Sequence, residues 1–234
     1  MLDLKEKVAF NKYYDEAPED QIARIWKIKA DFGTDLMLVA HHYQKDEIVQ
    51  FADARGDSLK LAQIAANNHT AKKIVFCGVH FMAETADILT ADNQDVILPD
   101  PMAGCSMADM ANPFQLNKAW QSLTADYGES IIPVTYVNSS AAIKAFVGKH
   151  GGVAITSSNA KKIMTWALKQ AKHLLFLPDQ HLGRNVAMDL GITADQIGLW
   201  HAQQDFLEAA HPEKVRVILW NGYCSVHQQF NVDH

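Results

Sequence analysis

The alternation of apolar runs with helix-length segments constrains the fold of this chain more than any other feature of its sequence. Seven runs have the length and apolar character of buried strands, namely 36–40, 74–76, 96–98, 131–136, 153–155, 174–177 and 215–220. Segments of helical length and period separate many of them, such as 46–67, 81–89, 141–147, 159–172 and 183–190. Because strands that alternate with helices form parallel sheets covered on both faces, the sequence predicts an α/β fold.

The composition of the chain limits the classes of partner that it could bind. The 234 residues are 48% hydrophobic, which is enough apolar material for one large core or two small ones. The net charge is −6 and no run of Lys or Arg could follow a phosphate backbone, so we expect no nucleic-acid partner. The first twenty residues mix charges unlike a secretory signal, and no apolar run approaches membrane-spanning length. We therefore expect a cytoplasmic protein without a membrane partner.

Polar side chains gather directly after the predicted strands. His41 follows one strand, Asn138 follows another, and the segment 156–159 follows a third. The loops after the carboxyl ends of parallel strands line the ligand crevice in such folds. Candidate functional residues are therefore expected in these loops.

Two cysteines occur in two segments of similar sequence, which we call the internal echo. A strand leads through a glycine to Cys105-Ser106, and a later strand leads through a glycine to Cys224-Ser225. If the echo is a structural repeat, both thiols occupy equivalent loops of two α/β units and could converge. The chain has three cysteines in all, an odd number and widely separated, which favours reduced thiols or metal ligands over disulfides.

The amino-acid sequences of seven segments resemble those of the quinolinate synthase family. They are VAHHYQ at 39–44, GDSLKLA at 56–62, FCGVHFMAETADIL at 76–89, AGCSMADM at 103–110, TYVNSS at 135–140, ITSSNA at 155–160 and NGYCSVHQ at 221–228. The resemblance implies a transferase of NAD biosynthesis that condenses iminoaspartate with dihydroxyacetone phosphate to quinolinate, water and phosphate. It also implies a 4Fe-4S cluster held by three cysteines, whose open iron acts as a Lewis acid. An aspartate oxidase is a further implied partner.

The resemblance assigns roles residue by residue. It implies that Cys105 and Cys224 hold the cluster, whereas Cys77 is a small buried hydrophobe. The implied substrate-binding residues are His41, Ser58, Tyr136, Asn138 and Ser157. His41, Tyr43 and Tyr136 are the implied catalytic residues. We expect His41 to point inward, with His42 on the opposite face if the strand continues, and His227 to lie near the cluster.

The family's fold implies three-layer α/β/α domains, each with a small parallel sheet, repeated around a pseudo-three-fold axis. We expect a first domain with an N-terminal helical extension at 1–112, a second at 113–221, and the start of a truncated third at 222–234. The third cysteine and a glutamate base belong to the part of the family pattern that has no counterpart here. The third domain is therefore expected to be missing, and this chain alone is expected to have little activity.

Two other interpretations stay open from the residues alone. Cys105 and Cys224, with His227 or a partner chain, could hold zinc in a non-catalytic module. Alternatively, the chain could be a Rossmann-like binder of small molecules with buried thiols. No G-x-G-x-x-G follows a strand, which disfavours the latter.

Overall fold

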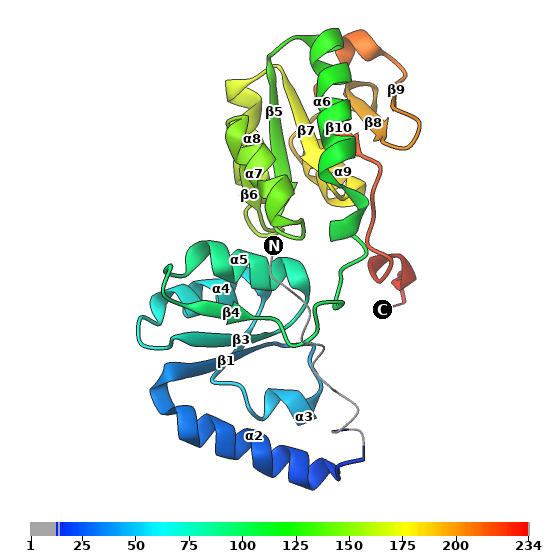
Figure 1. Cartoon of the computed structure of the whole chain (residues 1–234). Helices are drawn as coiled ribbons and strands as arrows, with labels where there is room; N and C mark the ends of the chain where they lie inside the picture. The colour runs from blue at the N-terminus through cyan, green and yellow to red at the C-terminus, as the bar shows by residue number, and fades with distance from the viewer. Residues whose placement is uncertain (1–12, 14, 234) are drawn as a thin grey trace.

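A computed structural model describes residues 13 and 15–233 of the chain. Two separate sheets, each covered by helices on both faces, form two α/β units stacked one on the other (Figure 1). Among the residues that the structure describes, all strand pairs but one are parallel. The predicted α/β class with parallel sheets is therefore confirmed.

The first unit contains a four-stranded sheet in the order β2-β1-β3-β4. Its strands are β1 (Leu36–His41), β2 (Ala54–Gly56), β3 (Lys73–Cys77) and β4 (Asp95–Ile97). Its helices are α2 (Pro18–Phe32), α3 (Asp46–Val49), α4 (Ser58–Asn67) and α5 (His80–Leu89). Apolar residues of α2 and α3 pack on one face of the sheet, and those of α4 and α5 pack on the other. Burial of both faces explains why β1 reads as a continuous apolar run.

The second unit contains a six-stranded sheet in the order β6-β5-β7-β10-β8-β9. Its strands are β5 (Ile131–Tyr136), β6 (Val153–Ile155), β7 (His173–Leu177), β8 (Ile197–His201), β9 (Phe206–Glu208) and β10 (Val217–Trp220). Its helices are α6 (Pro113–Tyr127), α7 (Ala141–Lys149), α8 (Ala160–Gln170) and α9 (Gln180–Asp189). Helices α6 and α7 cover one face of this sheet, and α8 and α9 cover the other. β9 pairs antiparallel with β8 at the edge.

One predicted helix is wrong. The sequence pattern predicts a helix over 46–67, but the segment contains α3, then β2, then α4. Phe51 is buried against Leu38 and Ala40, and the Asp53 carboxylate accepts the backbone N–H of Leu38 at 2.7 Å. These contacts hold the chain beside β1, where it pairs as an edge strand. Tertiary contacts thus overrode a helical period that the local sequence supports.

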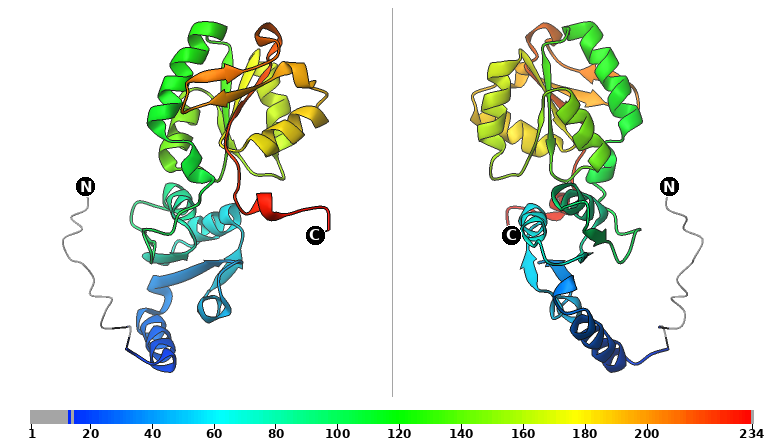
Figure 2. Two further views of the ribbon diagram at one scale, coloured as in Figure 1. Left: turned by 90° about the vertical axis from the view of Figure 1, so that its right-hand side faces the viewer. Right: turned by 60° about the vertical axis from the view of Figure 1, so that its left-hand side comes forward.

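The segment after β10 returns to the first unit. Trp220 donates its indole N–H to the carbonyl of Met110 at 2.9 Å, and both further views in Figure 2 show the following residues beside the first unit. Within the part of the chain that the structure describes, none of the helices combines the length and apolar character needed to cross a bilayer.

Candidate active site between the two units

The two cysteine loops meet between the units. The Ser106 and Ser225 hydroxyls, which directly follow Cys105 and Cys224, lie 2.9 Å apart and form a hydrogen bond. Their local structures also match. The Cys105 carbonyl accepts the N–H of residue 109, and the Cys224 carbonyl accepts the N–H of residue 228, each at 3.1 Å. The echo in the sequence therefore corresponds to a repeated turn whose two copies face each other.

A short 3-10 turn follows each cysteine at the same spacing. The two turns are η2 (Ala108–Met110) and η5 (His227–Gln229). His227 lies in this turn rather than one turn along an α-helix, and it lines a cavity of about 400 Å³ together with Cys224. Among residues 13 and 15–233, no three His, Cys, Asp or Glu side chains are grouped closely enough to hold a metal ion.

Cys77 lies apart from these loops. It ends β3 and packs beside Leu38, Ala40 and Phe51 on the α2 side of the first sheet. Burial raises the pKa of the Cys77 thiol to about 11, which keeps it protonated at neutral pH. A protonated thiol is a poor metal ligand, so these contacts agree with the interpretation of Cys77 as a small hydrophobe.

Tyr136 lies at the centre of the candidate site. It ends β5 and lines two cavities of about 400 Å³, as does Ser157 after β6. Burial raises the pKa of Tyr136, a hydrogen bond from Ser157 opposes the shift, and the negative charge of Asp179 adds to it. The phenol therefore stays protonated at neutral pH and can donate a hydrogen bond.

The cavity beyond Tyr136 has walls from both units. The first unit contributes Ser58 and its neighbours at the start of α4, and the second contributes Asn138 and the segment 156–158. Two helix amino termini approach it. Asp57 caps α4 by accepting the N–H of Lys60 at 2.9 Å, and α8 begins at Ala160, as the sequence predicted. The Asp57 carboxylate offsets the positive end of α4, whereas the start of α8 has no side-chain cap. The positive end of the α8 dipole, and Lys60 in the cavity wall, favour an anion here.

His41 is buried at the end of β1. Burial and the neighbouring His42 lower the pKa of His41 to about 4, so the imidazole is neutral at pH 7. Its Nδ1 accepts the N–H of Tyr43 at 3.4 Å, which assigns the proton to Nε2. The strand ends at His41, and the ring centroids of His41 and His42 lie 4.2 Å apart. We expected these two rings on opposite faces only if the strand continued through both residues. Because the strand ends at His41, that expectation does not apply.

Tyr43 connects His41 to the cysteine loops. Its ring centroid lies 3.9 Å from that of His41, and its hydroxyl lies 3.8 Å from the sulfur of Met82. Burial raises the pKa of Tyr43, and the charge of Cys105 adds to the shift. Tyr43 and Tyr136 thus both lie within the electrostatic reach of Cys105.

Asp179, which the sequence analysis did not name as a site residue, also lies in the candidate site. Its carboxylate caps α9 by accepting the N–H groups of His181 at 2.7 Å and Leu182 at 2.8 Å. The same residue is 4% exposed and lines the cavity with Tyr136 and Cys224. The polar residue after β7 was the available signal, since it follows a strand as His41 and Asn138 do.

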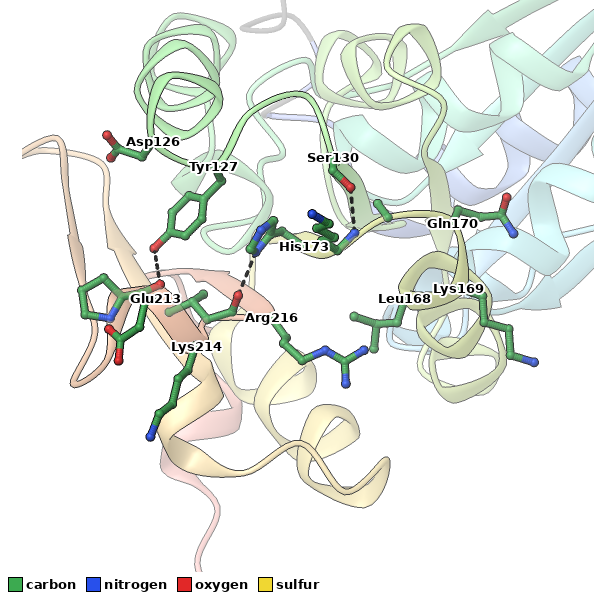
Figure 3. Close-up of a pocket in the computed structure, with 14 residues that line it drawn as sticks. Asp126, Tyr127, Ser130, Leu168, Lys169, Gln170, His173, Glu213, Lys214 and Arg216 are labelled. Carbon is green, nitrogen blue, oxygen red and sulfur yellow. Dashed lines mark hydrogen bonds between the residues drawn. The ribbon is translucent and has the colours of Figure 1, made fainter.

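A cavity of about 980 Å³ lies at the opposite, amino-terminal edge of the second sheet. Figure 3 shows its basic side chains Lys169, Lys214 and Arg216 pointing in different directions rather than toward a common centre. None of the sequence-predicted site residues lines it. The residues that the sequence singled out instead gather at the carboxyl ends of the strands.

Comparison with known proteins agrees with this arrangement. The family model described as Quinolinate synthetase A protein matches residues 23–234. The chain is 58% identical over 222 residues to the quinolinate synthase of Bacillus velezensis, which covers 95% of this chain and 60% of that protein. It is 59% identical over 222 residues to the quinolinate synthases of Bacillus cytotoxicus and Bacillus anthracis, covering 94% of this chain and 60% of each relative. The chain thus spans 60% of the length of the curated relatives it matches. The chain belongs to the quinolinate synthetase A family.

Proposed function

We propose that the chain carries part of a quinolinate synthase site, where iminoaspartate and dihydroxyacetone phosphate condense to quinolinate, water and phosphate. The observation that carries the proposal is the contact between the Cys105 and Cys224 loops, through Ser106 and Ser225, beside a cavity suited to anions. Both substrates carry negative charge, and so does the product. An acidic protein needs such local positive ends of helices to bind them.

The described side chains suit binding and orientation. Ser58, Asn138 and Ser157 line the cavity with hydroxyl and amide groups that can bond to phosphate or carboxylate oxygens. The protonated Tyr136 can donate to an oxygen on the other side of the same cavity. The neutral His41, with its proton on Nε2, can donate to a substrate carbonyl without adding a positive charge.

A 4Fe-4S cluster fits these residues in part. Cys105 and Cys224 would supply two thiolates from facing loops, and Cys77, the remaining cysteine of the chain, packs elsewhere with a raised pKa. When bound, a cluster with an open iron supplies a Lewis acid. With two thiolates in the site, we expect weak cluster binding and little turnover by this chain alone. The pseudo-three-fold arrangement and an aspartate oxidase partner remain predictions from the resemblance, and a cytoplasmic location remains a prediction from the sequence pattern.

The test joins this chain to the part of the Bacillus cytotoxicus relative that it does not match, followed by anaerobic reconstitution with iron and sulfide. The expected product shows the visible absorption of an iron-sulfur cluster and forms quinolinate from the two substrates. Cys105→Ser and Cys224→Ser should abolish both signals, and Cys77→Ser is the matched control that should keep them.

Two outcomes would count against the proposal. Bound zinc in place of iron, with no quinolinate formed, would favour the non-catalytic metal module. Loss of the cluster in Cys77→Ser but not in Cys105→Ser would mean that the wrong thiol has been assigned.

A further inference from the structure

Helix α5 of the first unit contacts helix α7 of the second unit. The Glu84 carboxylate accepts the backbone N–H of Ala141, the first residue of α7, at 2.7 Å. The two residues are 57 positions apart and belong to different sheets' helices, which pack together at the junction of the units. A carboxylate at a helix amino terminus satisfies an unpaired N–H and is stabilised by the helix dipole.

The loop before α7 carries Asn138, which faces the cavity opposite Ser58. Lys144 donates to the carbonyl of Ser139 in this loop, and its ammonium lies 5.5 Å from the ring centroid of Phe81 on α5. Ser139 is fully buried and donates its hydroxyl to the Tyr136 carbonyl at 2.8 Å. Lys144 of α7 therefore holds the loop at Ser139, and Glu84 of α5 holds the start of the helix that follows it at Ala141.

The same helix also holds the first cysteine loop. The N–H of His80, the first residue of α5, is donated to the carbonyl of Ala103, two residues before Cys105, at 2.9 Å. The His80 ring lies 3.5 Å from the second oxygen of Glu84. One helix thus connects the Cys105 loop to the Asn138 loop across the boundary between units.

We propose that Glu84 is a positioning residue whose carboxylate holds the start of α7 and thereby sets Asn138 opposite Ser58. We call the contacts of Glu84 with Ala141 and of Lys144 with Ser139 the α5–α7 clasp. The clasp acts through the loop and touches no substrate. Its functional consequence rests on the anion cavity proposed above, whereas its structural part stands on the contacts themselves.

The charges of the clasp are coupled. Burial lowers the pKa of Lys144 to about 8, and the nearby carboxylate of Glu84 opposes that shift. Glu84 is the charged group that acts on Lys144, and the His80 ring lies 3.5 Å from the other oxygen of the Glu84 carboxylate. Removing the charge of Glu84 should therefore lower the pKa of Lys144 further. The hold on the Ser139 carbonyl should weaken as the pH rises through that pKa, because the ammonium loses its proton.

The experiment measures amide exchange of Ala141 and affinity for inorganic phosphate in the whole chain. Glu84→Ala should raise the exchange rate of Ala141 and weaken phosphate binding, each by about tenfold, because one charge-assisted bond at the helix start is lost. Glu84→Gln keeps an acceptor oxygen, so it should recover most of both. In Glu84→Gln, the loss of phosphate affinity at high pH should also begin at a lower pH, because Lys144 loses its proton more readily. A purely structural role of Glu84 would not shift that pH.

Asp87→Asn is the matched control, since it removes a charge from an exposed position of α5 close to Glu84 and should change neither signal. Unchanged Ala141 exchange in Glu84→Ala would overturn the clasp, and so would equal effects of Asp87→Asn. If phosphate binds the native chain and is lost in Asn138→Ala but not in Glu84→Ala, the cavity stands and the clasp fails. If phosphate does not bind the native chain, the proposed cavity fails, and the exchange of Ala141 alone decides the clasp.

Discussion

At the scale of single residues, burial decides the protonation states in the site. His41 is 7% exposed, and its pKa is lowered because desolvation disfavours the imidazolium and His42 repels it. Tyr43 and Tyr136 shift in the direction that keeps each phenol neutral. The site at pH 7 therefore presents neutral donors beside helix amino termini, which suits anionic ligands.

The lowered pKa of His41 predicts a pH dependence of stability. Since the folded pKa is about 4 and the unfolded pKa is near 6.5, the unfolded chain binds more protons between these values. The free energy of unfolding should therefore fall as the pH drops from 6.5 to 4, by roughly 2 kcal/mol after allowance for solvent screening.

Urea unfolding at several pH values measures this, with His41→Gln expected to flatten the curve. His69→Gln, at an exposed position, is the control and should leave the slope unchanged. A titration of His41 near 6.5 by NMR would contradict the assignment.

At the scale of elements, side chains at helix starts connect local structure to the site. Asp57 caps α4, Ser140 caps α7 and Asp179 caps α9, and each lies directly after a strand or loop that faces the candidate site. These residue types were predictable, because Ser, Asp and Asn favour such positions. Their convergence was not predictable, because it depends on which strands are neighbours in the sheet.

Asp179→Ala should lower the free energy of unfolding by about 2 kcal/mol. The buried carboxylate accepts two N–H groups of α9, which the alanine would leave without a partner. Chemical denaturation measures the change. Asp189→Ala, at the exposed end of the same helix, removes only a surface ion pair with Lys161 and should cost less than about 1 kcal/mol. Equal costs for the two variants would exclude capping as the cause.

At the scale of the whole molecule, the path of the chain from β10 to the Cys224 loop depends on a close backbone contact with the segment after β7. A Cβ added at Gly222 would lie 2.1 Å from the carbonyl oxygen of Pro178. The Gly222 carbonyl also accepts the N–H of Gln180 at 2.9 Å. Since both neighbours are backbone, the contact cannot relax by rotating a side chain.

Gly222→Ala should therefore destabilise the chain by about 2 kcal/mol or more and displace the Cys224 loop. Thermal unfolding and the rate of Cys224 alkylation measure the two effects, and alkylation should become faster. Gly148→Ala is the control. It lies in α7 with nothing near its added Cβ, so it should stabilise the chain by about 0.5 to 1 kcal/mol. Unchanged Cys224 reactivity in Gly222→Ala would contradict the proposed constraint.

The sequence by itself determined the alternation of strands and helices, because period and apolar runs are local properties. All seven predicted strands occur, whereas the strands β2, β8 and β9 and the helix α6 were not predicted. β2 was hidden inside a helical period, since its pairing with β1 depends on contacts remote in sequence. The motifs also identified the family, because residue types at fixed spacing can be recognised in a sequence without any knowledge of their contacts.

Only the tertiary structure decided which of these residues meet. The bond between Ser106 and Ser225 joins loops 119 positions apart, and that between Glu84 and Ala141 joins helices of different units. Neither contact has a local signature, because each depends on how two sheets stack. Local chemistry thus specified the elements and the kinds of residue after each strand, and packing between the units assembled them into one candidate site.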